Sequence, residues 1–235
     1  MHWKGNFYPQ DLAAKNFLSF YCDKFETAEI NNSFYRLPKK EMLKNWVDAT
    51  PEDFLFSVKA SRYITHMKKL KEPKKSIKAF FDTIGVLGKK MGPVLFQLPP
   101  RWKVNPRRLT EFLNELPEGF RYAFEFRDVS WFDDEIYKIL RKAGASFCLY
   151  ELAGESAPLN ITADFVYIRL HGPAGAYEGS YSKTALEEWK NKIVKWSREA
   201  KEIYCYFDND QQGFAAANAL SLKEIIDKEA RGAGS

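Results

Sequence analysis

Residues 73–98 read PKKSIKAFFDTIGVLGKKMGPVLFQL, and this stretch decides the fold. Its first part, 73–88, has the spacing of an amphipathic helix that begins at a proline. Its last part, 93–98, is an apolar run with the length of a buried strand. An amphipathic helix that leads into a short apolar strand is typical of a parallel sheet covered by helices on its faces.

The same alternation extends in both directions along the chain. Further helices are predicted at 9–22, 38–49, 106–116, 133–142, 182–199 and 214–228, and further strands at 26–30, 54–59, 121–127, 146–150, 165–170 and 203–208. The number of strands is near the eight of a TIM-type (β/α) barrel and also fits an open doubly wound sheet. Because neither GxGxxG nor GxxxxGK[ST] occurs, the sequence favours the barrel among α/β folds.

Length and composition indicate a single globular domain. The chain has 235 residues, of which 45% are hydrophobic and 29% charged. These values supply enough apolar surface for a core, and no low-complexity stretch or change of composition marks a second domain. We therefore predict one barrel domain over 1–229 and a flexible tail at 230–235.

Charge, cysteines and hydropathy limit the location and partners. The net charge of +5 permits anionic partners without requiring them. Three widely spaced cysteines suggest neither a disulfide framework nor a metal motif, which is typical of a reducing compartment. Since no apolar run is long enough to span a bilayer and no signal peptide is evident, we predict a cytoplasmic protein without a membrane partner. The cofactor stays unknown.

The positions of polar residues along the strands carry the main functional signal. Side chains two residues apart share a face of a strand, so Ser57 and Lys59 lie opposite Phe56 and Val58. The other predicted strands repeat this design. Because the apolar faces must meet the helices, the polar faces point into the barrel, with their charges near the C-terminal ends of the strands.

In a barrel these C-terminal ends share one mouth, where we predict the functional site. The residues expected there are Glu29, Asn31, Lys59, Arg62, Gln97, Glu125, Arg127, Arg169, His171 and Asp208. Charges inside a protein must be paired, hydrated or completed by a ligand. An internal network of salt bridges with a purely structural role is the alternative to an active site, and both interpretations stay open.

Six ordered stretches also resemble a known family. They are EINNSFYRLP (29–38), FSVKASRYITH (56–66), GPVLFQLPP (92–100), FEFRDVSWF (124–132), YIRLHG (167–172) and YFDNDQQGFAAANAL (206–220). Together they are similar to the domain of unknown function 72 family, also called YecE-like, over nearly the whole chain. The resemblance implies a TIM-type barrel whose biochemical activity is not established.

One departure from the family pattern concerns the N-terminus. Family members begin with a strand that ends in a Gly-Thr-Ser-Gly-like turn before a WKGxFYP stretch, whereas Trp3, Lys4 and Gly5 stand near the start of this chain. The resemblance therefore implies that the first barrel strand is absent. Because an exposed sheet edge invites pairing with another chain, oligomerisation through such an edge is a further prediction.

The leading hypothesis is an enzyme that acts on a polar substrate bearing a phosphate or a carboxylate. Hydrolase and isomerase chemistry both stay open, and the few histidines, without closely spaced ligands, predict no metal site. The candidate catalytic residues are Glu125, as general acid or base, with His171 and Asp208; the candidate substrate-binding residues are Lys59, Arg62, Arg127 and Arg169 for the anion and Glu29, Asn31 and Gln97 for orientation.

A second hypothesis is a non-catalytic protein that binds nucleic acid or a nucleotide. The lysine-rich stretch KKLKEPKK (68–75) could contact a phosphate backbone, and aromatic residues near the predicted mouth could stack on bases. A solvated surface loop explains the same lysines. The glycine-rich segment GPAGAYEGSY (172–181) is expected to be a flexible loop or a mobile lid.

Overall fold

The computed structural model describes residues 3–232, with side chains up to Glu229. These residues form two compact units. The central unit comprises 18–148 with 160–163, and the terminal unit comprises 3–17, 149–159 and 164–232. Both contain parallel strands that alternate with helices, which confirms the predicted α/β class. The single domain over 1–229 stays a prediction.

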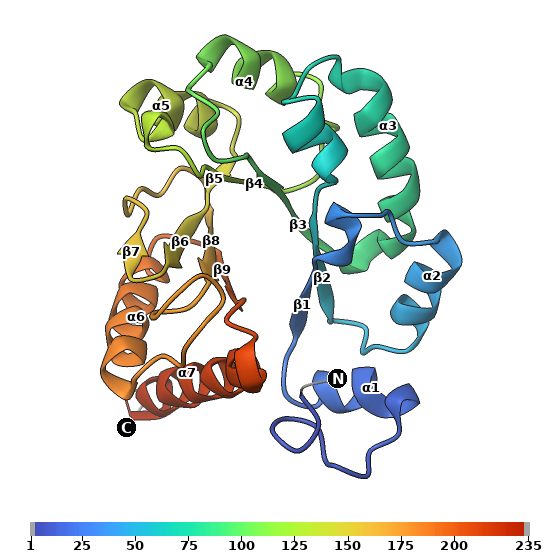
Figure 1. Cartoon of the computed structure of the whole chain (residues 1–235), viewed down its shortest axis with the longest axis vertical. Coiled ribbons are helices and arrows are strands. Elements are labelled where there is room, and N and C mark those ends of the chain that lie inside the picture. Colours follow the sequence, from blue (N-terminus) through green and yellow to red (C-terminus); the bar gives the residue numbers. More distant parts are fainter. Residues whose placement is uncertain (1–2, 233–235) are drawn as a thin grey trace. The chain divides into compact units, whose positions relative to one another are not determined.

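The central unit is built on a five-stranded parallel sheet with the order β1-β2-β3-β4-β5 (Figure 1). Its strands are β1 (Thr27–Ile30), β2 (Leu55–Lys59), β3 (Met91–Gln97), β4 (Tyr122–Glu125) and β5 (Ser146–Phe147). The register places Gln97 beside Glu125 and Lys59 beside Leu95. Because neighbouring strands are parallel and consecutive in the chain, their C-terminal ends meet at one edge of the sheet.

Four helices connect consecutive strands and cover one face of this sheet (Figure 1). They are α2 (Lys40–Asp48), α3 (Pro73–Ile84), α4 (Pro106–Leu113) and α5 (Asp134–Lys142). Helix α3 begins at a proline, as predicted, and so does α4, because the first turn of a helix does not use the amide that proline lacks. The carboxylate of Asp133 accepts from the backbone amide of Glu135 and so caps α5.

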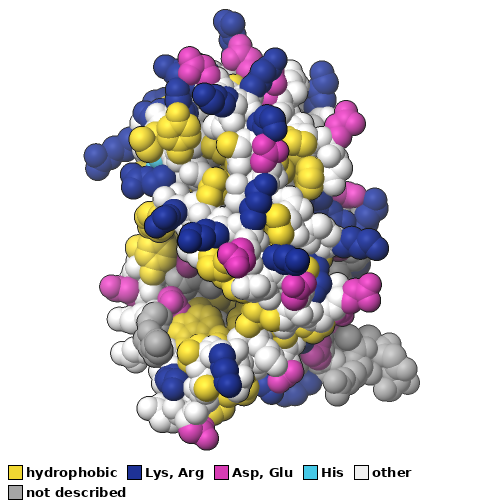
Figure 2. Space-filling model, turned by 90° about the vertical axis from the view of Figure 1, so that its right-hand side faces the viewer, with side chains coloured by type: hydrophobic (Ala, Val, Ile, Leu, Met, Phe, Trp, Pro, Cys, Tyr) yellow, Lys and Arg dark blue, Asp and Glu magenta, His cyan; other side chains and the backbone are white. Residues whose placement is uncertain are grey.

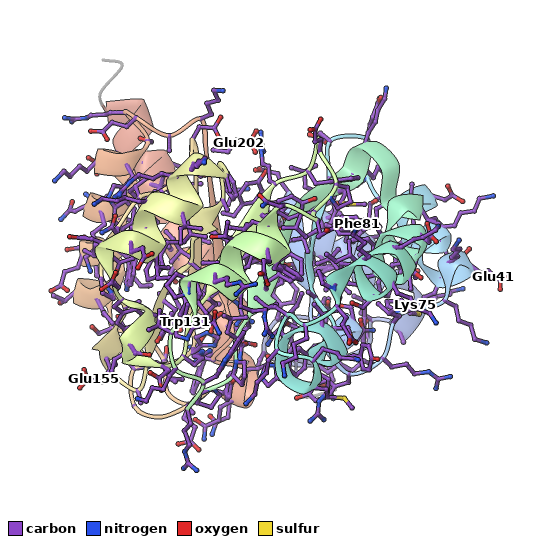
Figure 3. The ribbon with its side chains drawn as sticks, turned by 90° about the horizontal axis from the view of Figure 1, so that it is seen from above. Glu41, Lys75, Phe81, Trp131, Glu155 and Glu202 are labelled. Carbon is purple, nitrogen blue, oxygen red and sulfur yellow. The ribbon has the colours of Figure 1, made fainter. Side chains whose placement is uncertain are left out.

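Aromatic side chains fill the space between this sheet and its helices. Phe96 and Phe124 stack with ring centroids 5.2 Å apart, and both contact Phe112 of α4. Trp131, labelled in Figure 3, is fully buried and stacks on Phe126. Each such ring stabilises the fold by roughly 1.5–3 kcal/mol. The alternate residues of the strands therefore face the opposite side, which is the polar face that the sequence predicts.

The terminal unit has a four-stranded sheet with the order β7-β6-β8-β9. Strands β6 (Leu149–Leu152), β8 (Phe165–Leu170) and β9 (Glu202–Phe207) are parallel, and β7 (Glu155–Ser156) is antiparallel to β6. Helix α7 (Phe214–Gly232) packs against β9 and against α6 (Lys183–Trp196). Among residues 3–232, no helix combines the length and the apolar composition that crossing a bilayer needs.

The structure corrects the helix predicted at 9–22. Helical turns begin only at Ala14 and continue into α1 (Phe17–Cys22). Residues 9–13 form a turn instead, in which the amide of Leu12 donates to the carbonyl of Pro9 at 3.1 Å. A second turn precedes it, in which the carbonyl of Trp3 accepts hydrogen bonds from the amides of 6–8, and the ring of Tyr8 stacks on Phe17 at 4.2 Å. Between residue 3 and β1 the described chain contains no strand, only these turns, α1 and an isolated bridge from Lys4 to Tyr8.

Two further boundaries differ from prediction. The strand expected at 146–150 is divided into β5 and β6 by Cys148, and β7 follows a turn at Ala153 and Gly154, both with positive φ. Helix α7 reaches Gly232, three residues into the segment expected to be a flexible tail, and 233–235 lie outside the described residues. The strand pairs found within residues 3–232 give two open sheets, so the TIM-type barrel stays a prediction.

Candidate functional site

The C-terminal edge of the central sheet brings predicted site residues onto neighbouring strands. Lys59 ends β2, Gln97 ends β3 and Glu125 ends β4. Adjacent strands lie about 4.8 Å apart, and side chains in register share a face, so Gln97 and Glu125 are direct neighbours. All three side chains are buried, with exposed fractions of 8%, 9% and 0% for the residues in chain order.

Glu125 and Arg127 form a buried ion pair at the end of β4. The Nε of Arg127 donates to Oε1 of Glu125, and the Sγ of Cys148 lies 4.0 Å from Oε2. The side chain of Arg127 is only 8% exposed. Two opposite charges that are removed from water stabilise each other, and either one alone is costly. The pair therefore fixes the orientation of the arginine at the strand end.

Lys59 lies against an aromatic ring from the turn that follows β1. Its Nζ is 4.5 Å from the ring centroid of Phe34, within the range of a cation–π interaction. Phe34 belongs to the short helical turn Asn32–Phe34, which Asn31 precedes. In the same turn, the hydroxyl of Ser33 is 2.8 Å from the carbonyl of Ile30 and 2.6 Å from that of Lys59. Ser33 thus ties the ends of β1 and β2 together.

Arg62 and His66 extend the positive charge beyond the end of β2. Arg62 is exposed and directly precedes the π-helical turn Tyr63–Met67, which contains the half-buried His66. The Nδ1 of His66 is 2.9 Å from the hydroxyl of Thr65, and its ring contacts Phe34 edge-on at 5.0 Å. Burial first, and then the charges of Lys59 and Arg62, lower the pKa of His66 from 6.5 to about 4. The protonated ring is disfavoured because the cations at this edge repel it.

The remaining polar groups of this edge differ in their bonding. Glu29 lies on β1 in register with Ser57, on the polar face. The amide oxygen of Gln97 is buried and accepts no hydrogen bond from the part of the chain that the structure describes. Among the described residues, no three His, Cys, Asp or Glu side chains come together as a metal-binding group.

The terminal unit contains a second cluster, formed by Arg169 of β8, His171 and Asp208. The Nη2 of Arg169 donates to Oδ2 of Asp208 at 3.0 Å, and the Nδ1 of His171 is 3.2 Å from the same oxygen. The Nε2 of His171 is 3.3 Å from Nη1 of Arg169. A guanidinium can only donate, so Nε2 accepts and Nδ1 carries the proton that bonds the carboxylate. The arginine and the carboxylate thus hold a neutral imidazole in one tautomer.

The glycine-rich segment 172–181 is tied to the terminal unit by hydrogen bonds. The amide of Gly172 donates to the hydroxyl of Tyr181 at 3.1 Å, and the side-chain amide of Asn209 donates to the carbonyl of Gly179 at 2.8 Å. Gly172 has φ +113°, and a Cβ there would lie 2.3 Å from the carbonyl oxygen of Glu178. The segment is therefore an ordered loop that requires glycine at its entry.

The structure thus groups the predicted residues within each unit. The central unit gathers Glu29, Asn31, Lys59, Arg62, Gln97, Glu125 and Arg127 at the ends of β1–β4, and the terminal unit gathers Arg169, His171 and Asp208. Sequence reasoning missed Ser33 and Cys148. A serine between two strand ends, or a cysteine within an apolar strand, gives no signal in the sequence that separates a site residue from a core residue.

The chain matches known proteins over nearly its whole length. A family model described as a protein of unknown function, DUF72, matches residues 1–234. The UPF0759 protein YunF of Bacillus subtilis (strain 168) is 28% identical over 262 residues, which cover 96% of this chain and 92% of that protein. The UPF0759 protein YecE of Escherichia coli (strain K12) is 31% identical over 118 residues, or 49% of this chain and 43% of that protein.

Two crystal structures have folds that closely resemble the fold of this chain. A DUF72 family protein of Thermotoga maritima MSB8 has a TM-score of 0.86 at 31% identity, covering 96% of this chain and 95% of that one. A DUF72 family protein of Enterococcus faecalis V583 has a TM-score of 0.80 at 23% identity, covering 91% and 94%. Because the Enterococcus faecalis protein is only 23% identical, its similarity to this chain concerns the fold alone.

Breaking the buried pair should cost far more than breaking an exposed one. Glu125→Gln removes the buried carboxylate that the cation of Arg127 contacts, so we expect the free energy of unfolding to fall by about 3–5 kcal/mol in urea denaturation. The matched control is Glu111→Gln, which breaks the exposed pair with Arg107 and should cost less than about 1 kcal/mol. Equal losses in the two variants would contradict the pairing.

His66 should make stability depend on pH in a defined window. Its pKa is about 4 in the folded chain and 6.5 without the fold, so the unfolded chain binds the extra proton between these values. The contribution of the neutral His66 ring to the free energy of unfolding is then complete above pH 6.5, and it is lost progressively as the pH falls towards 4. At pH 5 we expect a loss of about 1 kcal/mol, after allowance for solvent, relative to His66→Gln. An NMR titration of His66 with a midpoint above 6 would refute this.

The ring of His171 should occupy the Nδ1–H tautomer. Long-range ¹H–¹⁵N NMR distinguishes the two ring nitrogens of a neutral histidine, and we expect the pattern of a protonated Nδ1. Arg169→Met removes the donor that Nε2 accepts from, so that variant should show a mixture of tautomers. A protonated Nε2 in the unaltered chain would show that the hydrogen bonds of this cluster are wrongly assigned.

Proposed function

We propose, for a chain that belongs to the DUF72 family of proteins of unknown function, that the C-terminal edge of the central sheet binds a small anion bearing phosphate or carboxylate. The observation that carries the proposal is the placement of Lys59, Arg62 and Arg127 at or just beyond the C-terminal ends of β2 and β4, the two strands that flank β3. The low pKa of His66 supports it, because the ring senses the positive charges of Lys59 and Arg62.

The geometry suggests how this edge would hold an anion. Glu125 anchors Arg127 through Nε, which positions a planar guanidinium suited to an oxyanion. Lys59 contributes a compact charge and lies against Phe34, a ring that limits its motion. Charges held in place before binding lose little side-chain entropy when the ligand arrives.

We further propose that Glu125 exchanges a proton with the bound molecule. In the described structure its Oε1 accepts from Nε of Arg127, and the other N–H groups of the guanidinium would contact the anion, so the anchor stays in place. The carboxylate would thereby lie next to the ligand and take part in acid–base chemistry there. Hydrolase and isomerase reactions both use a carboxylate in this way, and the proposal extends to either class.

For the terminal unit we propose that Arg169 contacts an anionic group and that Asp208 and His171 position it. The support is the pair of bonds from Asp208 Oδ2 to the arginine and the imidazole. A ligand at this cluster must exchange some of these internal bonds for its own. That exchange makes the terminal cluster more costly to occupy than a site whose polar groups still lack partners.

Two further proposals concern the architecture of the whole chain and its cellular location. We propose the TIM-type barrel for the whole chain, supported by parallel strands that alternate with helices in both units and by the single residue, Cys148, between β5 and β6. We propose a cytoplasmic location, supported by three free thiols at Cys22, Cys148 and Cys205. Oligomerisation through a sheet edge stays a prediction.

A small anion is favoured over nucleic acid by the bonding of the lysine-rich stretch 68–75. Lys68 pairs with Glu72 at 2.9 Å and Lys74 with Glu115 at 3.5 Å, so nearby acids offset part of the positive charge. On the face shown in Figure 2, Lys and Arg side chains are interspersed with Asp and Glu rather than gathered in one basic patch. Nucleic-acid binding depends on such a patch.

Anion binding should stabilise the chain and raise the pKa of His66. Phosphate at 100 times its Kd should add about 2.7 kcal/mol to stability, measured by thermal denaturation, and should move the NMR titration of His66 upwards from about 4 by offsetting the neighbouring cations. Lys59→Met should weaken both effects. Lys75→Met, an exposed lysine of α3 labelled in Figure 3, is the matched control.

Three outcomes decide between the hypotheses. Loss of binding in Lys59→Met but not in Lys75→Met supports the small-anion site. An oligonucleotide that binds with steep salt dependence and is weakened by Lys75→Met would support the nucleic-acid alternative instead. If neither phosphate nor acetate changes the melting temperature or the titration of His66, the proposed function is wrong.

A further inference from the structure

The side chain of Gln97 carries a buried acceptor that the described chain leaves unused. Its Oε1 has no hydrogen-bond partner, although the residue is only 9% exposed. Most buried side-chain oxygens in folded proteins accept at least one hydrogen bond, because an unpaired one loses its bonds to water without replacement. Such an oxygen at the mouth of a proposed site points to a group that the ligand supplies.

The donors that neighbour Gln97 on the polar face have contacts of their own, and within residues 3–229 none reaches its Oε1. Glu125, in register with it on β4, is itself an acceptor that Arg127 and Cys148 contact. Arg127 directs its Nε to that carboxylate, and Lys59 on the other side directs its ammonium over the ring of Phe34. The missing partner of the amide oxygen is therefore a donor from outside the sheet.

The charge of this edge selects the kind of donor. An ammonium group and a hydroxyl can both donate to an amide oxygen. Lys59, Arg62 and Arg127 outnumber the acids Glu29 and Glu125 here, so a cation would meet net repulsion. A hydroxyl donates without adding positive charge.

We propose that the ligand of the central sheet is a hydroxylated anion, in which a hydroxyl group next to the phosphate or carboxylate donates to Oε1 of Gln97. Small polyol phosphates and hydroxy acids belong to this chemical class. The inference rests on the proposed function, since the anion must first occupy the positive edge. Gln97 is then a specificity-determining residue, because it distinguishes ligands by a hydroxyl and not by their charge.

The test compares two anions that differ only in their hydroxyls. Glycerol 1-phosphate and n-propyl phosphate carry the same phosphate on a chain of the same length. One hydrogen bond gained in a buried site corresponds to roughly a tenfold change in affinity, so we expect calorimetry to give a Kd about tenfold lower for glycerol 1-phosphate. If the unaltered chain binds glycerol 1-phosphate and n-propyl phosphate with equal affinity, the inference is overturned without any variant.

Gln97→Met removes the amide and keeps the length of the side chain. In this variant the preference for glycerol 1-phosphate should vanish, while the Kd for n-propyl phosphate stays the same. The melting temperature without ligand should stay equal or rise, because the unpaired acceptor is gone. Gln10→Met, at an exposed position, should keep the full preference and is the control for the substitution itself.

The results separate this inference from the proposed function. If both phosphates bind and raise the pKa of His66, but the preference is absent or survives Gln97→Met, the anion site stands and the role of Gln97 is wrong. If neither phosphate binds, the proposed function fails and the inference fails with it. A preference for glycerol 1-phosphate that disappears in Gln97→Met but not in Gln10→Met supports both the proposed function and the role of Gln97.

Discussion

The alternation of side chains along the parallel strands is the constraint on which the rest of the central unit depends. Aromatic residues such as Phe96 and Phe124 must face α4 to be buried, and this fixes the register of β3 and β4. Once these rings are placed, Gln97 and Glu125 have no other side to occupy. The position of the polar edge is thus a consequence of core packing, and its charges are tolerated because hydrophobic burial on the other face outweighs their cost.

Sequence reasoning predicted the elements whose burial is one-sided. The sequence predicted that Ser57 and Lys59 lie on the opposite face of their strand from Phe56 and Val58. It could do so because side chains that alternate every two residues have only two faces to occupy. The proline that opens α3 was equally informative. What the alternation determines is which residues share a face and an end of the sheet, and the strands confirmed this for the ends of β2, β3 and β4.

Pairing within the site could not be predicted, since it depends on distances that alternation does not set. The alternation places Glu125 and Arg127 on the same side of their strand, but only the coordinates show the bond between them. The start of the helix predicted at 9–22 was wrong for a related reason. The apolar spacing of 9–13 fits a helix, but these residues form a turn in which the amide of Leu12 donates to the carbonyl of Pro9, next to the stacked rings of Tyr8 and Phe17.

Each unit leaves one buried amide oxygen without a partner among the described residues, Oε1 of Gln97 in the central unit and Oδ1 of Asn209 in the terminal unit. The two polar clusters differ in their charge, and this difference carries the functional argument. In the terminal unit, Asp208 and His171 each bond more than one partner, so the cluster resembles a structural network. In the central unit, Oε1 of Gln97 accepts no hydrogen bond from the described residues, and burial, followed by the charges of Lys59 and Arg62, lowers the pKa of His66. A fold under selection for stability alone would replace such a glutamine with an apolar residue of similar size. Its presence beside a positive strand edge is best explained by a ligand that brings both the negative charge and the missing donor.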